Sequence, residues 1–168
     1  MFVFIDGVRL RTKEERIRYL NSIGLDVSEN DPYIQKLGDM GCALAHINAN
    51  KFIIQQNFPM ALILEDDVTI DSPEVFRKIL NYRHTESAGD YCFVQNIKEW
   101  GTGAQIVTNK GARVIVSNID SVLRDSVDIS IIQGKVPGLK VGRGEVLFHQ
   151  SPEVIDPNSE RGKLNHPN

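Results

Sequence analysis

The chain alternates between short apolar runs and longer segments in which apolar side chains recur every three or four residues. The longer segments predict helices, because a helix completes a turn in about 3.6 residues; they cover 12–24, 41–57, 71–83 and 109–123. The short apolar runs predict strands; they cover 2–5, 60–64, 91–97, 104–108, 127–132 and 146–150. Strands that alternate with helices predict an α/β fold, in which helices flank both faces of a mostly parallel, Rossmann-type sheet.

Signals for the ends of helices support this division. Thr12 and Glu15 have the spacing of a capping box, and Gly24 is suited to end the helix that they begin. Pro73 falls in the first turn of the third predicted helix, where its missing N–H is tolerated. Asn109 is the expected cap of the fourth.

The length of 168 residues predicts one small domain. Residues 25–38 are polar and predict a loop between the first two helices. We expect the compact domain to cover 1–150. The polar, proline-containing segment 151–168 predicts a loosely packed or disordered tail.

The formal net charge of −3 argues against a nucleic-acid partner, which would require a basic surface. Cys42 and Cys92 are too few for a disulfide framework and predict reduced thiols. No apolar run approaches the roughly 20 residues of a transmembrane helix. The charges near the N-terminus follow its apolar residues, the reverse of a signal peptide. These features predict a cytoplasmic protein without a transmembrane segment.

The segment "ALILEDDV", 61–68, runs from an apolar strand into Glu65, Asp66 and Asp67. Ligands of α/β proteins bind beyond the carboxyl ends of strands, so these carboxylates lie where a site is expected. Adjacent carboxylates raise one another's pKa unless a cation compensates, and oxygen ligands suit Mg²⁺ or Mn²⁺. A metal that holds a diphosphate is one interpretation, and a solvated acidic turn is the other.

Receiver domains of bacterial signalling also contain an apolar strand that ends in an acidic pair. They require a phospho-accepting Asp at the end of a later strand, and the predicted strands 91–97 and 104–108 do not end in Asp. A receiver also begins with the acidic strand, whereas here a strand and two helices precede it. This alternative is the weaker one.

The segment 41–68 resembles glycosyltransferase family 25, which includes lipooligosaccharide β-galactosyltransferases and collagen galactosyltransferase domains. The family carries Gly-Cys, a Ser-His pair, a helix, and an apolar strand that runs into Glu-Asp-Asp. Gly41, Cys42 and His46 match this pattern, and Ala45 replaces the Ser. The flanking segments "VFIDGVRLRTKEERIRYLNSIGL", "GTGAQIVTNKGARVIV" and "SVDISI" are similar to further parts of the family, so that the resemblance extends over most of 2–150.

The resemblance implies a GT-A fold and the inverting transfer of a hexose, with galactose as the first candidate, from a UDP-sugar to a glycan or lipooligosaccharide acceptor. It also implies a Mn²⁺ or Mg²⁺ ion at the acidic triplet. The chain departs from the family in its short length, in Asp6 where the family has Asn, and in Ser126 where it has Pro. A shortened, non-catalytic member that binds a nucleotide or a glycan is therefore the principal rival.

Each candidate residue has a structural alternative, such as a helix cap, a solvated surface or a satisfied core histidine. Asp128 is the candidate catalytic base, and Glu99 and Trp100 are candidates for binding the acceptor. The expected metal ligands are Glu65, Asp67 and His149. The candidates for donor binding are Asp6, Arg11, Arg16, His46 and Asp66.

Overall fold

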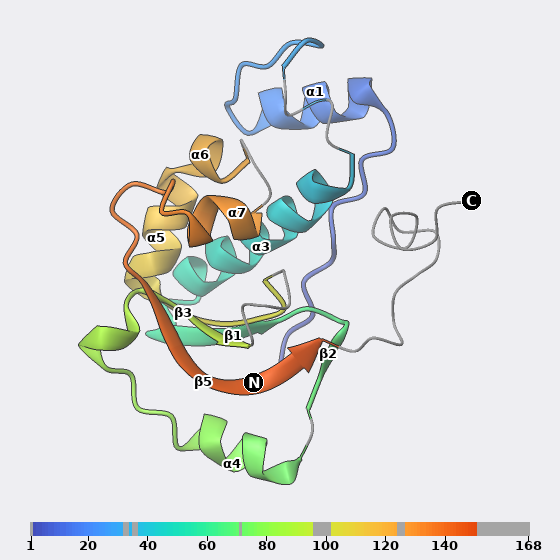
Figure 1. Ribbon diagram of the computed structural model, residues 1–168. Coiled ribbons are helices and arrows are strands. Elements are labelled where there is room, and N and C mark those ends of the chain that lie inside the picture. Colours follow the sequence, from blue (N-terminus) through green and yellow to red (C-terminus); the bar gives the residue numbers. More distant parts are fainter. Residues whose placement is uncertain are drawn as a thin grey trace.

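The computed structural model describes residues 2–31, 34, 37–70, 72–95, 102–123 and 127–150 (Figure 1). The helices are α1 (Lys13–Ser22), α3 (Leu37–Gln55), α4 (Pro73–Leu80), α5 (Asn109–Ser117), α6 (Ile119–Leu123) and α7 (Val127–Ile132), with a 3₁₀ turn, η1, at Glu86–Ala88. The strands are β1 (Met60–Leu64), β2 (Val68–Thr69), β3 (Tyr91–Gln95), β4 (Ala104–Thr108) and β5 (Val141–Gln150). The expected tail, 151–168, lies outside the described residues.

The strands form one mixed sheet in the order β1-β4-β3-β5-β2. Only β3 and β5 pair in parallel; β1 with β4, β3 with β4, and β2 with β5 are antiparallel. The prediction of a mostly parallel sheet is therefore wrong. Parallel neighbours require a crossover of about a dozen residues or more, and 96–103, which join β3 to β4, are too few for one.

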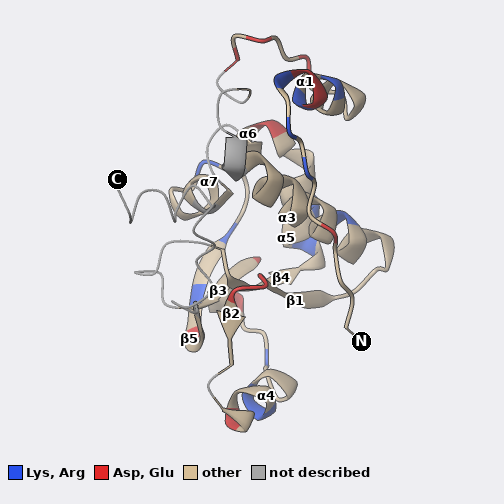
Figure 2. Cartoon of the chain, turned by 90° about the vertical axis from the view of Figure 1, so that its right-hand side faces the viewer, with Lys and Arg blue, Asp and Glu red and all other residues tan. Residues whose placement is uncertain are grey.

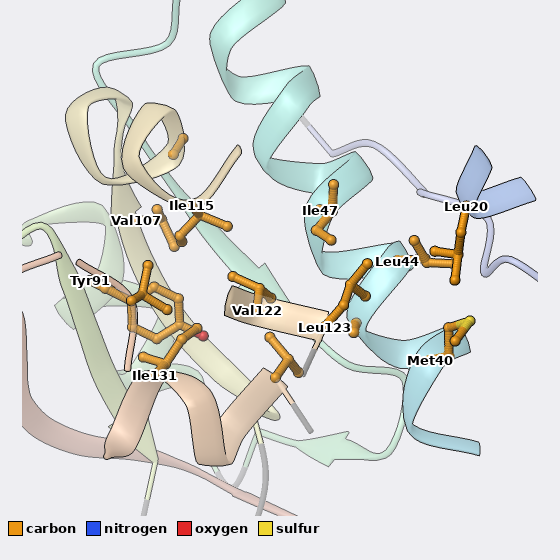
Figure 3. Close-up of a cluster of buried hydrophobic side chains, with 14 of the residues drawn as sticks. Leu20, Met40, Leu44, Ile47, Tyr91, Val107, Ile115, Val122, Leu123 and Ile131 are labelled. Atoms are coloured by element: carbon orange, nitrogen blue, oxygen red, sulfur yellow. The ribbon is translucent and has the colours of Figure 1, made fainter. Parts of the chain in front are cut away.

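Helices cover both faces of the sheet, as predicted. On one face α3, α5, α6 and α7 enclose a core with the alternate strand residues Tyr91 and Phe93 (Figure 3). On the other face, the intervening residues of β3 pack against Val75 and Ile79 of α4. In Figure 1, α1 lies beyond α3 from the sheet, and α4 stands alone on the opposite side. Mixed α/β architecture in a small domain is confirmed.

Local signals identified several elements well. Thr12 and Glu15 form the expected capping box of α1, and Gly24, with a φ of +89°, follows its C-terminal end. Pro73 begins α4, and β1 coincides with the predicted strand. The second helix begins at Leu37, inside the segment 25–38 that the sequence predicted to be a loop.

Other local predictions are wrong. The segment 2–5 is not a strand, and its Phe2 and Phe4 side chains are 87% and 99% exposed. Segment 127–132 is the helix α7, not a strand. Its buried residues Val127, Ser130 and Ile131 have the spacing of one helical face, but so short an apolar run cannot be assigned by periodicity alone.

The fourth predicted helix differs in two details. Its cap is Thr108, whose hydroxyl accepts from the Gly111 N–H at 3.0 Å, whereas Asn109 donates to the carbonyl oxygens of Ile53 and Phe58. Asn118 ends α5, and α6 starts at the next residue. In the described part of the chain, no helix combines the length and the apolar character needed to cross a membrane.

Candidate functional site

The acidic turn, Glu65–Asp67, follows β1 directly. The ladder between β1 and β4 ends where Leu64 pairs with Ala104, and the Glu65 N–H then donates to the Gly103 carbonyl at 2.8 Å. Figure 2 shows the turn as a short red loop beside the labels β2 and β4. Pairing with β4 therefore fixes where the carboxylates emerge from the sheet.

The Glu65 side chain turns inward, toward α3 and the segment before β4. Its Oε1 atom lies 2.9 Å from His46 Nε2 and accepts a hydrogen bond from Thr102 Oγ1 at 2.7 Å. Cys42 Sγ also donates to this oxygen, at 3.6 Å. We call Glu65, His46, Cys42, Thr102 and Gln105 the Glu65 network.

Helix α3 presents the side chains of Cys42 and His46 from one face. Cys42, His46 and Asn50 follow one another at i, i+4 spacing and therefore lie on one face of the helix. His46 is 5% exposed, and Asn50 Nδ2 donates to the His46 carbonyl oxygen at 2.8 Å. The thiol of Cys42, by contrast, is on an exposed residue at the solvent end of this row.

Gln105 of β4 contacts the other nitrogen of the imidazole. Its Nε2 atom lies 3.0 Å from His46 Nδ1, and the residue is completely buried. In this amide orientation Nδ1 accepts, so Nε2 of His46 carries the hydrogen that faces Glu65. Gln105 Oε1 is buried without a hydrogen-bond partner within the described structure.

The electrostatics favour an ionised Glu65. Burial raises the pKa of the Glu65 carboxyl, but several interactions outweigh it. They are the hydrogen bond from His46, the charge of the imidazole when it is protonated, and the hydrogen bonds from Thr102 and Cys42. Together they hold the pKa of Glu65 below its usual range.

The two aspartates of the turn have different surroundings from Glu65. Asp66 is exposed, and Asp67 is half-buried. Thr69, two residues beyond Asp67, pairs with His149 across the ladder between β2 and β5 and donates to the His149 carbonyl oxygen at 3.1 Å. The ladder thus brings the half-buried His149 to the strand that follows the acidic turn.

Among the described residues, one group of three potential metal ligands has all its ligand atoms within 4.8 Å of one another: Cys42, His46 and Glu65. Asp67 and His149, which were expected to bind a metal with Glu65, do not belong to that group. The expected metal set therefore divides into Glu65, which turns inward to α3 and Thr102, and the half-buried residues Asp67 and His149, which lie at and beside β2.

The N-terminal segment carries two of the expected donor-binding residues. Asp6 and Arg11 are exposed. The segment crosses α3 closely, because a Cβ atom on Gly41 would lie 3.0 Å from the Val8 carbonyl oxygen. Figures 1 and 2 show it on the same side of the molecule as the acidic turn.

Arg16 is not at this site. It lies in α1, is 1% exposed, and donates from Nη1 to the Ile34 carbonyl oxygen at 2.7 Å. The backbone of Asp128 lies in α7, but its side chain is outside the described structure. Glu99 and Trp100 also lie outside the described residues.

Sequence reasoning missed Thr102 and Gln105. Gln105 had a visible signal, since it is a polar residue within the apolar run that forms β4. Thr102 had none, because a threonine between two glycines is ordinary in a loop. Its 1% exposure and its contact with Glu65, 37 positions earlier, exist only in the folded chain.

Comparison with known proteins identifies the family of the chain. No curated protein matches the chain. A family model described as "Glycosyltransferase family 25 (LPS biosynthesis protein)" matches residues 1–100, which include α3, β1 and the acidic turn. A match over more than half of the chain establishes membership. The chain belongs to glycosyltransferase family 25.

Proposed function

We propose that the chain is a metal-assisted, inverting glycosyltransferase that moves a hexose, with galactose as the first candidate, from a UDP-sugar to a glycan or lipooligosaccharide acceptor. Family membership supports the reaction class. The observation that carries the finer proposal is the acidic turn, in which the exposed Asp66 and the half-buried Asp67 follow the inward-facing Glu65. A diphosphate could approach the turn from solvent at Asp66.

The residues of the turn fit a hard divalent cation. Mg²⁺ and Mn²⁺ prefer oxygen ligands, and Mg²⁺ commonly uses one or two carboxylates and completes its coordination with water and phosphate oxygens. Asp67 and Asp66 would supply these carboxylates, and His149, beside β2, would suit Mn²⁺. A bound cation would neutralise the charge that develops on the leaving diphosphate.

Glu65 has a different role in this proposal. Because three side chains already engage its Oε1 atom, it serves to position the turn rather than to bind the metal. His46 acts through Glu65 and is likewise a positioning residue. This assignment removes Glu65 from the expected ligands of the Mn²⁺ or Mg²⁺ ion and keeps His46 as a support beneath the donor site.

The remaining residues would bind the two substrates. Asp6 and Arg11, which are exposed on the N-terminal segment, would contact the ribose or the phosphates of the donor. Glu99 and Trp100 would form an acceptor surface. Asp128 would take the proton from the acceptor hydroxyl. The oxygen of that hydroxyl would bond to the anomeric carbon while the bond from this carbon to the diphosphate breaks.

The first test is titration calorimetry of UDP into the full chain, with and without Mn²⁺. We expect binding that requires the metal and that is lost or strongly weakened in Asp67→Asn and Asp66→Asn. Asp26→Asn is the matched control, because Asp26 is an exposed carboxylate in the loop after α1. It should bind UDP as the unmodified chain does.

Absence of UDP binding under every condition, or binding that neither variant changes, would overturn the donor site. Metal-dependent binding should be followed by incubation with UDP-galactose and UDP-glucose and a glycan acceptor. Release of UDP supports the transferase. Tight donor binding without UDP release would instead support the non-catalytic rival.

A further inference from the structure

The Glu65 network brings three different metal-ligating groups together: a thiol, an imidazole and a carboxylate. Glu65 Oε1 lies 2.9 Å from His46 Nε2 and 3.6 Å from Cys42 Sγ. Ligands of a tetrahedral Zn²⁺ ion lie roughly 2.0–2.3 Å from the metal, which places them roughly 3.3–3.8 Å from one another. Glu65 Oε1 would therefore have to lie a few tenths of an ångström farther from His46 Nε2, whereas its distance from Cys42 Sγ already fits. The ligand atoms of Cys42 and His46 lie within 4.8 Å of each other, so a bound ion would draw them together by up to about 1 Å.

The thiol, imidazole and carboxylate of this group favour a different metal ion from the one that the carboxylates of the acidic turn favour. A cysteine thiolate is a soft ligand and an imidazole is intermediate, so the pair favours Zn²⁺ over Mg²⁺ or Mn²⁺. Three protein ligands with one open position are typical of zinc sites that retain a water molecule. The exposure of Cys42 and the partial exposure of Glu65, 23% for its side chain, would admit that water.

The surroundings of Gln105 are a second observation that supports a metal ion bound to His46. A histidine that binds a metal through Nε2 carries its hydrogen on Nδ1, which needs a hydrogen-bond acceptor. Gln105 already lies 3.0 Å from Nδ1, and its Oε1 atom is buried without a hydrogen-bond partner within the described structure. Turning the amide over would place that oxygen against Nδ1–H. Gln105 can therefore stabilise either tautomer of His46.

We propose that Cys42, His46 and Glu65 form a Zn²⁺ site that is separate from the Mn²⁺ or Mg²⁺ site of the acidic turn. The site joins α3 to the carboxyl end of β1 and so fixes the residue immediately before Asp66. Binding removes the proton of the Cys42 thiol and moves the imidazole hydrogen from Nε2 to Nδ1. A neutral His46 changes tautomer without losing a proton, so the net release is about one proton per ion.

Co²⁺ is the probe of choice, because it replaces Zn²⁺ and reports its ligands by absorption. The full chain, first freed of metal with a chelator, is titrated with Co²⁺. We expect a thiolate-to-metal charge-transfer band in the near ultraviolet and the intense visible bands of a tetrahedral ion. Addition of Zn²⁺ should abolish both and protect one thiol from alkylation.

The two cysteines provide a matched pair of variants. Cys42→Ser changes an exposed residue and should abolish the charge-transfer band. Cys92→Ala changes the other cysteine, which is buried in the opposite core, and should leave the band unchanged. Gln105→Leu should retain the band but weaken Zn²⁺ binding by about 10–100-fold, the loss expected when the partner of a histidine ligand is removed.

The results separate this site from the proposed donor site. Asp67→Asn, which should weaken UDP binding, should retain the Co²⁺ charge-transfer band. No Co²⁺ binding, a spectrum without a thiolate band, or a band that persists in Cys42→Ser would overturn the zinc site. None of these outcomes would by itself affect the donor-site proposal.

Discussion

Replacement of Thr102 by valine tests the Glu65 network most directly, because valine retains the shape of the side chain and removes its hydroxyl. That hydroxyl donates to Glu65 Oε1 at 2.7 Å and lies 3.1 Å from His46 Nε2. Thr102 is 1% exposed, so water cannot readily replace it as a donor. A hydrogen bond to a charged group contributes about 1.5–3 kcal/mol.

The cost of Thr102→Val should depend on pH. Because the pKa of Glu65 is lowered in the folded chain, its ionised form stabilises the fold above the unfolded pKa. That stabilisation is lost as the pH falls through the folded pKa of Glu65. We therefore expect Thr102→Val to lower the free energy of unfolding by about 2 kcal/mol at neutral pH. The loss should be smaller once Glu65 is protonated.

Urea unfolding of the metal-free chain at neutral and acidic pH measures this difference. A slope near 2 kcal/mol/M converts the loss to a shift of about 1 M in the neutral midpoint. Thr85→Val is the control, because the exposed Thr85 hydroxyl lies 3.0 Å from the neutral Ser87 hydroxyl and not beside a carboxylate in the described structure. Its effect should stay within about 0.5 kcal/mol. If Thr102→Val lowers the free energy of unfolding equally at both pH values, the role of ionised Glu65 is refuted.

Two further predictions concern the helix that follows β4. Gly111→Ala should destabilise the chain by about 1–3 kcal/mol, because the added Cβ would lie 2.9 Å from the Asp90 carbonyl carbon and closer to its oxygen. Gly7→Ala, where a Cβ meets nothing within 4 Å, is the control in the same unfolding assay, and equal effects would contradict this packing argument. Ile115 is 1% exposed in the main core, so Ile115→Ala should cost about 2–5 kcal/mol and Ile115→Val about 0.5–1.5 kcal/mol. Thermal unfolding of both variants checks whether the alanine variant loses more stability than the valine variant. Equal stability would show that the surroundings of Ile115 are not closely packed.

Some features of the candidate site could be predicted from the sequence, and others could not. The apolar run before Glu65 predicted β1, and the resemblance predicted the family; both were confirmed. The direction of the Glu65 side chain was not predictable, because it depends on donors from α3 and from Thr102. The burial of Arg16 was not predictable either. An arginine in a polar helix is normally exposed, but this one is buried and donates to the carbonyl oxygen of Ile34.

What the sequence determined by itself was mostly local. The capping box of α1, the proline that begins α4 and the extent of β1 depend on residues a few positions apart, and they were confirmed. Tertiary structure decided the pairing of β3 with its neighbours, the helical state of 127–132 and the inward turn of Glu65. The physical reason is that strand pairing, burial and hydrogen bonds between side chains depend on partners far away in the sequence, and no local pattern specifies those partners.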